Sequence, residues 1–443
     1  MVKGAGTENA PHEYDHSSTK EGSVLSHENE GPTSSAQEQP APPDGGLYGW
    51  LVVLGACFVF FNTWGLVQAF GAYQSYYTTK TLRENNASTI SWIGTIQAWL
   101  LVSVGVISGP IFDQGYLRTL VFAGSSMIVF GVMMLSLARS YYQILLAQSI
   151  CIGLGSGLLF TPSVAQVTVT FSAKRRPLAL GLSMVGTGAG GIVFPIVFNQ
   201  LEPRIGFGWT TRVIGFISLA TLSISVVSLS WKRTPRKPPR ALFEMSALKQ
   251  PTFVIYGVSA FLVFTAYWVP WFFIPLYGEF GVGATATFSS YLLAITNACG
   301  IVGRLITPLF QKRFTSLQTI LIMTILGDIL IWSWISIHTI GSFVVFCVFW
   351  GLFTGPLAVL PASAVADLSP NLNSIGTRIG MIWFFSSFGN LIGAPIAGAV
   401  SNPTQNDFLG GQAYAGACMA GSAVLTAAIL FLLHADRSKK REN

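Results

Sequence analysis

Residues 50–71 read WLVVLGACFVFFNTWGLVQAFG, an apolar run without a charged side chain. About 20 such residues, wound as a helix, cross the ~30 Å hydrocarbon core of a bilayer. Similar runs recur at about 89–111, 117–137, 141–170, 178–198, 209–231, 253–277, 286–310, 317–338, 342–361, 375–400 and 414–434. In lipid, each backbone amide must find its partner within its own segment, so we expect helices. The sequence therefore predicts an all-α membrane protein with twelve transmembrane helices.

The composition excludes a soluble protein. Of 443 residues, 51% are hydrophobic and only 10% are charged, and the mean hydropathy is +0.55. A soluble domain carries about 25% charged residues, because its surface must be hydrated. The net charge of +7 comes from short basic clusters between the apolar runs, which argues against a nucleic-acid partner. The five cysteines lie inside apolar runs without metal-ligand spacing, so we expect neither a metal site nor a disulfide framework.

The connections divide the chain into five parts. The N-terminal tail, residues 1–48, is rich in Ser, Glu, Gly, Pro and Thr and is expected to be disordered. The longest internal connection, residues 232–252, is rich in Lys, Arg and Pro. It separates a six-helix half, residues 49–231, from a second half, residues 253–434, and residues 435–443 form a short tail. This arrangement resembles the hydropathy pattern of major facilitator transporters.

The basic residues predict the orientation. Lys and Arg gather in the connections on one side, at Arg118, in residues 174–176, 232–249 and 312–313, at Arg378, and in the C-terminal tail. The other side carries Lys80, Arg83, Arg139, Arg204 and Arg212. Since cytoplasmic loops are the basic ones, we expect both termini to be cytoplasmic. The expected location is the cell membrane, with the vacuolar membrane as the alternative.

One external loop carries a candidate modification site. Asn86-Ala87-Ser88 is a glycosylation sequon, and it falls in the predicted first external loop. We therefore expect Asn86 to be available to a glycosyltransferase, close to the membrane surface.

The loop between the second and third runs reads GPIFDQGYLR, residues 109–118. It resembles the loop signature of the major facilitator superfamily, with Gly109, Asp113 and Arg118 at the positions of its glycine, acid and basic residue. A carboxylate here accepts from helix N-terminal amides or pairs with an arginine across the cytoplasmic face. Such contacts would hold one conformation and break in the other, which predicts a gate. The alternative is an ordinary polar turn.

Four segments carry a more specific resemblance: PDGGLYGW (43–50), GLGSGLLFTPS (153–163), PRIGFGW (203–209) and IGTRIGM (375–381). Together they are similar to the monocarboxylate transporter family, and most similar to its fungal branch. The resemblance covers residues 43 to about 400. It implies a multi-pass carrier that moves a small organic anion or metabolite by alternating access, without a bound cofactor. We expect it to act as a monomer in the bilayer.

The run Gly186-Thr187-Gly188-Ala189-Gly190-Gly191 fits the glycine pattern of dinucleotide sites. That pattern requires a preceding strand and a following helix, whereas this run lies within an apolar helix. Gly186 and Gly190 instead have the spacing of small residues that let two membrane helices approach closely. We expect helix packing here and no cofactor.

Arg304 lies well within the eighth run. An arginine in the hydrocarbon is costly, by at least ~2.5 kcal/mol, so it must face protein or a wet cavity. Its planar fork of donors suits a carboxylate. The family resemblance implies a substrate-binding arginine in this helix, and Arg304 occupies the matching place. The alternative is an arginine that extends to the cytoplasmic end of its helix.

Two positions depart from the proton-coupled members of that family. Where those carry a lysine in the first helix and an acid one turn before the arginine, this chain has Gln68 and Gly300. Gln68 cannot exchange a proton near neutral pH, so we assign it to substrate binding. Asp328 is the only acidic residue deep in any predicted run. It is either a relocated proton carrier or a neutral side chain packed between helices, and the sequence favours neither.

Further polar and aromatic residues lie inside the apolar runs. Tyr267, in the sequence YWVPWFF (267–273), is the choice for a cavity wall that receives a ring-bearing ligand. Asn62, Asn297 and Asn390 are each either ligand contacts or interhelical hydrogen bonds.

These patterns predict a transporter. Export of a secondary metabolite is favoured slightly over proton-coupled uptake of a monocarboxylate or vitamin, because both titratable family positions are lost. A membrane solute sensor is the alternative from another class, although the C-terminal tail is short for one. An enzyme is not expected, because no nucleophile, base and orienting group can be assembled.

Overall fold

The computed structural model describes residues 46–172, 175–231, 242–369 and 375–442, and within them the elements are helices. The prediction of a disordered tail falls almost wholly on residues outside this set, as does the first half of the central connection. Three predicted boundaries are wrong. Gly46 to Tyr48 already belong to the first helix, residues 251–252 begin the seventh, and the last helix continues to Glu442. Ala, Lys and Arg are good helix formers, so the last helix extends beyond its apolar segment.

The N-terminal half begins with a path of three helices, α1, α2 and α3, that ends in a π-helical turn, η1. The bounds of its elements are α1 Gly46–Asn62, α2 Trp64–Gln68, α3 Phe70–Tyr76, η1 Tyr77–Thr81, α4 Ala87–Asp113, α5 Leu117–Leu135, α6 Tyr141–Ile144, η2 Leu145–Ile152, α7 Gly153–Thr170 and α8 Arg176–Ser230. The first path breaks at Thr63, whose hydroxyl donates to Val59 O at 2.8 Å. Such bonds compete with the helical ladder and bend helices.

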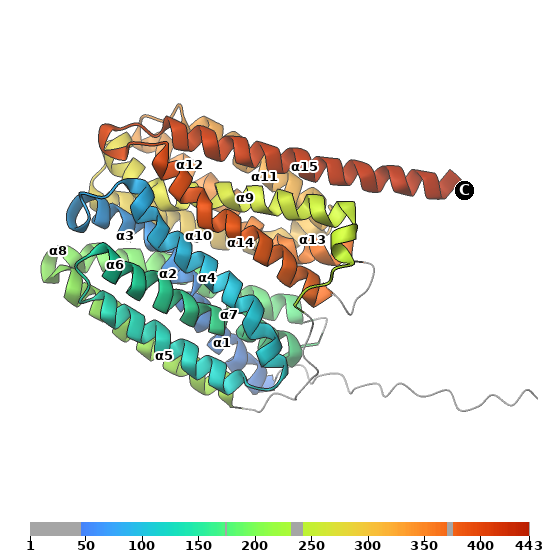
Figure 1. Cartoon of the computed structure of the whole chain (residues 1–443), viewed down its shortest axis with the longest axis horizontal. Coiled ribbons are helices and arrows are strands. Elements are labelled where there is room, and N and C mark those ends of the chain that lie inside the picture. The colour runs from blue at the N-terminus through green and yellow to red at the C-terminus, as the bar shows by residue number, and fades with distance from the viewer. Residues whose placement is uncertain (1–45, 173–174, 232–241, 370–374, 443) are drawn as a thin grey trace, which may run out of the picture. The chain divides into compact units, whose positions relative to one another are not determined.

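The C-terminal half begins with a short 3₁₀ turn before its first long helix, α9, which is labelled in Figure 1. Its elements are η3 Ala247–Lys249, α9 Pro251–Leu276, η4 Tyr277–Gly281, α10 Ala286–Gln311, α11 Ser316–Trp334, α12 Ile340–Thr354, η5 Gly355–Ala358, α13 Leu360–Leu368, α14 Ile375–Ala399, η7 Pro403–Gln405 and α15 Leu409–Glu442. The helical path of α9 and η4 extends to Gly281, past the predicted end at 277, so Glu279 lies on a spanning helix.

Eleven helical paths in the described residues are long and apolar enough to cross a membrane. One of them, α8, has 55 residues and contains a break at Gly206 (φ 75°, ψ 166°). Both ends of α8 lie at the same end of the bundle, because Arg176 lines the cavity described below and Arg118, just after α4, donates to Ser230 O at 2.9 Å. The helix is therefore a hairpin of two crossings, and the prediction of twelve spans is confirmed.

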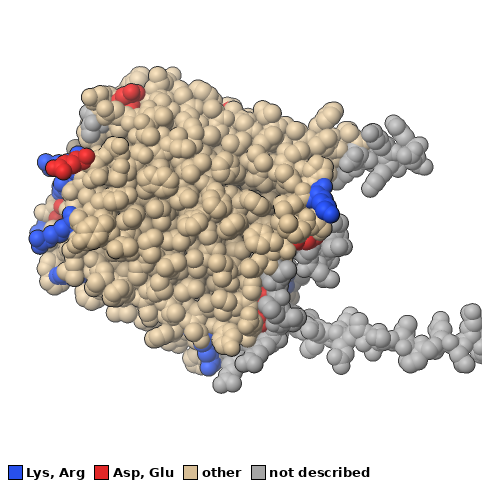
Figure 2. All heavy atoms as spheres, in the orientation of Figure 1, with Lys and Arg blue, Asp and Glu red and all other residues tan. Residues whose placement is uncertain are grey.

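The positions of the charged residues match a bundle that spans the lipid bilayer, and small residues allow its helices to pack closely. On the face drawn in Figure 2, the described charged side chains lie towards the two ends and leave the band between them bare. The halves meet where α4 packs on α14, α8 on α10, and α3 on α9. Gly186 lies against Cys57 O and Gly190 against Phe61 O, so the prediction that these glycines serve helix packing is confirmed.

Candidate functional site

A cavity of about 800 Å³ lies between the two halves. It reaches from the middle of the bundle to the end where α4 finishes and where α8 and α14 begin, so that Asp113, Arg176 and Gly376 line its mouth. The spacing of α8 and α10 is wider near the mouth than deeper in the bundle. A Cβ added at Gly181, near the mouth, would meet nothing within 4 Å, whereas one added at Gly188 would meet Ile301 of α10. The cavity is therefore open at one end of the bundle.

The opposite end is closed by contacts between the halves. Phe70 packs on Phe272 with ring centroids 4.8 Å apart, and Gly71 lies so close to α9 that a Cβ there would be 2.8 Å from Trp271 O. Beyond them, Ser75 donates to Glu279 Oε1 at 2.6 Å. These contacts join α3 to α9 and η4, and they leave a one-sided cavity.

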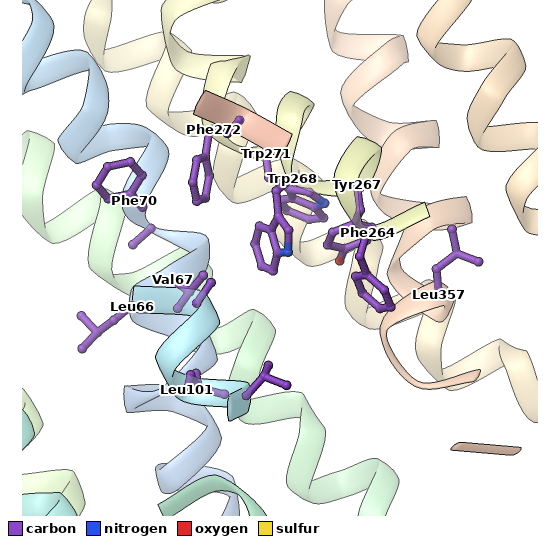
Figure 3. Close-up of a cluster of buried hydrophobic side chains, with 14 of the residues drawn as sticks. Leu66, Val67, Phe70, Leu101, Phe264, Tyr267, Trp268, Trp271, Phe272 and Leu357 are labelled. Atoms are coloured by element: carbon purple, nitrogen blue, oxygen red, sulfur yellow. The ribbon is translucent and has the colours of Figure 1, made fainter. Parts of the chain in front are cut away.

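Most of the cavity wall is apolar and much of it is aromatic. Trp64 of α2 stacks on Trp268 of α9 across the boundary between the halves, with centroids 5.9 Å apart and an interplanar angle of 2°. Phe160 of α7 packs edge-on against Trp64, at 5.6 Å. Phe264, Tyr267 and Trp268 project from one stretch of α9 (Figure 3), and all three line the cavity. The wall suits an apolar, ring-bearing ligand.

Polar groups meet at one place in this wall. With its amide oriented to pair donors with acceptors, Gln68 accepts from Arg304 Nη2 at 3.1 Å and donates to Thr187 O at 3.2 Å and to Asn297 Oδ1. Arg304 Nε also donates to Gly355 O at 3.2 Å. Gln68 belongs to the N-terminal half and Arg304 to the other, so the bond between them crosses the boundary. Three residues predicted to bind substrate, Gln68, Asn297 and Arg304, therefore lie together.

The same place holds unused donors. The Tyr267 hydroxyl lies beside the Arg304 guanidinium and the Trp271 indole. Arg304 Nη1, the Tyr267 hydroxyl and Trp271 Nε1 are all buried, and among the described residues none makes a hydrogen bond of full geometry beyond the close approach of Arg304 and Trp271 to the Tyr267 oxygen. Leaving such groups unpaired costs about 1–3 kcal/mol each. The group is therefore primed for an acceptor, and Arg304 makes a negatively charged one favourable.

The structure separates the predicted asparagines from the cavity surface. Asn62 is fully buried and donates to Thr221 Oγ1 at 2.8 Å, which ties α1 to α8. Asn297 is 1% exposed and donates to Gly191 O at 3.1 Å, which ties α10 to α8. Neither lines the cavity. Asn297 reaches it only through Gln68, and Asn62 is an interhelical contact.

The predicted gate residues lie at two places. Gly109 and Asp113 line the mouth of the cavity. Arg118 does not line it and instead bonds the end of α8. This places Asp113 where the two halves must approach each other if the mouth closes, and it places Arg118 within one half.

Asp328 and Asn86 lie away from the cavity. Asp328 is half-buried on α11 and does not line the cavity, and its buried Oδ1 has no hydrogen-bond partner in the part of the chain that the structure describes. Asn86 is exposed at the start of α4, where its side chain accepts from Thr89 N at 2.8 Å as a helix cap. Within the described residues, no three His, Cys, Asp or Glu side chains are grouped to hold a metal ion.

Sequence reasoning missed an ion pair beside the mouth. Arg378 at the start of α14 is 1% exposed and donates to both carboxylate oxygens of Glu244, at 2.8 and 2.9 Å, and to Gln250 Oε1 at 2.9 Å. The pair fastens the end of the central connection to α14, next to cavity-lining Leu242. The one signal was an acid in an otherwise basic connection.

Twelve crossings in two halves around a one-sided cavity with unpaired donors define a membrane carrier. The comparisons agree, because residues 52–394 match the family model described as Major Facilitator Superfamily. The chain belongs to this superfamily. A structure of a peptide transporter in complex with sulfate has the same fold, with a TM-score of 0.67 at 15% identity, covering 87% of this chain and 94% of that one.

The proteins similar in sequence include fungal transporters. An MFS-type transporter of Gibberella zeae is 37% identical over 396 residues, which is 89% of each chain. The aspyridones efflux protein of Emericella nidulans is 34% identical over 395 residues, 89% of this chain and 80% of that protein. The agnestins efflux protein of Paecilomyces divaricatus is 30% identical over 353 residues, 80% of this chain and 81% of that protein.

Proposed function

We propose that this transporter exports a small organic acid or secondary metabolite by alternating access, within the fungal monocarboxylate-porter branch of its superfamily. The observation that carries the proposal is the set of buried, unpaired donors at Arg304 and Tyr267 beside a cavity open at one end. Two similar proteins bear the names of efflux proteins, which supports export over uptake.

Orientation follows from the charges. The mouth lies beside the basic connections, so it faces the cytoplasm in a cell-membrane protein with both termini inside. Cargo enters there from the cell. The halves then close at Asp113 and part at the Ser75–Glu279 bond, and the cargo leaves outside. One chain encloses the whole cavity, so a monomer is sufficient.

The residues around Arg304 favour export that is not coupled to proton movement. Gln68, and not an ionisable residue, bridges to Arg304. At Gly300, an added Cβ would have its nearest neighbours at 3.6 and 3.8 Å, in ordinary van der Waals contact, yet the chain has no side chain there. Asp328 lies outside the cavity. The negative charge of the cargo is therefore neutralised by Arg304. The concentration gradient of the cargo itself then drives its export.

Arg304→Lys tests this function. Lys keeps the charge but loses the fork that holds Gln68 and Gly355 together with an anion. In cells that make the metabolite, we expect strong intracellular retention with normal membrane insertion, as measured by mass spectrometry of cells and medium. Arg313→Lys is the matched control, because Arg313 is exposed in the turn that follows the same helix. Normal export by Arg304→Lys would remove Arg304 from the site and with it the proposed mechanism.

A further inference from the structure

The stacked Trp64 and Trp268 are held differently by their own halves. The Trp268 indole donates to Asn390 Oδ1 at 2.9 Å, and Tyr267 packs edge-on against its ring at 5.1 Å. Trp64 makes ring contacts to Phe160 and Trp268 and is only half-buried. It lies on α2, a five-residue helix between breaks at Thr63 and Ala69. Among the described residues, Trp268 is therefore held by a hydrogen bond as well as by ring contacts, and Trp64 by ring contacts.

The pair lies on the route to the closed end. The next ring contact between the halves is formed by Phe70, six residues after Trp64, and Phe272, four residues after Trp268. A cargo that crosses the bundle must separate the indoles before it reaches them. Separation breaks an aromatic contact, which is recovered if the cargo offers a flat ring of its own.

The unpaired donors lie one helical turn from this pair. Gln68, which bridges to Arg304, follows Trp64 by four residues on the same face of α2. Tyr267 adjoins Trp268 in sequence, and its hydroxyl lies beside Arg304. One compact ligand can therefore place an acidic oxygen against Arg304 and a ring against the two indoles.

Building on the proposed export function, we propose that the cargo is a planar conjugated ring acid. Its ring stacks against Trp268 after Trp64 turns aside, and its acidic oxygen accepts from Arg304 and Tyr267. A short aliphatic acid leaves the indoles without a partner, and a neutral ring leaves the guanidinium without one. The cavity thus selects for both features.

The test measures binding to the purified full chain in lipid nanodiscs by isothermal titration calorimetry. Three probes separate the two features: 2-naphthoate is planar and acidic, decalin-2-carboxylate is acidic but puckered, and 2-naphthamide is planar but neutral. We expect 2-naphthoate to bind about tenfold more tightly than either of the others, because one aromatic pair or one charge-assisted hydrogen bond accounts for a change of that size. Equal binding of 2-naphthoate and decalin-2-carboxylate by the wild-type chain would overturn the proposal.

Substitutions assign the planar preference to the pair. Trp64→Leu and Trp268→Leu keep an apolar side chain without a ring, and should each lower the preference for 2-naphthoate over decalin-2-carboxylate about three- to tenfold. Trp209→Leu is the control, because Trp209 is exposed near the α8 break. A preference that survives both pair substitutions would also overturn the proposal. If the variants do not fold, the wild-type comparison still decides.

The two proposals fail separately. If Arg304→Lys abolishes export but the wild-type chain binds 2-naphthoate and decalin-2-carboxylate equally, only the proposal of a planar cargo is contradicted. Normal export by Arg304→Lys contradicts the proposed function itself.

Discussion

The Ser75–Glu279 hydrogen bond joins the two halves at the closed end of the cavity, at 2.6 Å. If the protein alternates access, this bond exists with the mouth open and must break when the closed end opens. Ser75→Ala removes the donor and leaves a good helix former in α3. We expect the variant to shift the population away from the mouth-open conformation.

The size of the shift follows from the bond. A hydrogen bond to a charged group contributes about 1.5–3 kcal/mol. Glu279 is partly exposed, so water replaces part of that contribution, and about 1–2 kcal/mol is a fair expectation. That corresponds to a five- to thirtyfold change in the conformational equilibrium.

Spin labels on Glu84→Cys and Thr287→Cys report the separation, because both residues are exposed at the closed end on opposite halves. Double electron–electron resonance should show a larger long-distance population in Ser75→Ala. Ser223→Ala is the control, since its hydroxyl bonds only Leu219 O within its own helix. An unchanged distance distribution in Ser75→Ala, or an equal change in the control, would refute the role of this bond.

Three further predictions concern residues around the mouth and outside the cavity. Asp113→Asn should slow transport while leaving equilibrium binding largely intact, because Asp113 lines the mouth and not the polar group; lost binding at an unchanged rate would contradict this. Asp328→Asn should leave transport and its response to a collapsed pH gradient unchanged in proteoliposomes, and a proton flux abolished by this variant would show that Asp328 couples protons. Glu244→Ala should lower stability by about 2–3 kcal/mol, because it strands the buried Arg378, and should lower the melting temperature in detergent; Ser246→Ala, which removes only a donor to Glu244, should melt near the wild-type temperature.

The spans could be predicted because bilayer thickness sets their length. What hydropathy could not resolve is detail inside an apolar run. The residues around Thr63 and Ala69, where the helical path is interrupted, lie within one apolar run, so hydropathy does not mark these positions. The turn at Gly206 lies between the predicted runs 178–198 and 209–231, so hydropathy separated these two crossings. Glu279 lies outside the predicted run, because the apolar run ends before the helix does.

The candidate site divides along similar lines. An arginine in an apolar helix must find polar neighbours, so Arg304 and its companion Gln68 could be expected together. The stacking of Trp64 on Trp268 could not, because helices that are apolar all round carry no periodicity that fixes their rotation. Glu244 was missed since its partner, Arg378, is 134 residues away and had been counted as a loop charge.

The hairpin of α8 also bears on how this protein is made. Gly206 alone turns the chain between two crossings, in a backbone conformation that favours glycine. Because no loop separates them, we expect both crossings to enter the bilayer together, with Glu202 and Arg204 at the turn between them. The partner of the first crossing, α10, is synthesised about 80 residues later in the chain. Until it arrives, Gly188 and Gly191 face lipid, so we expect the newborn N-terminal half to await its partner with a groove of glycines exposed to the membrane.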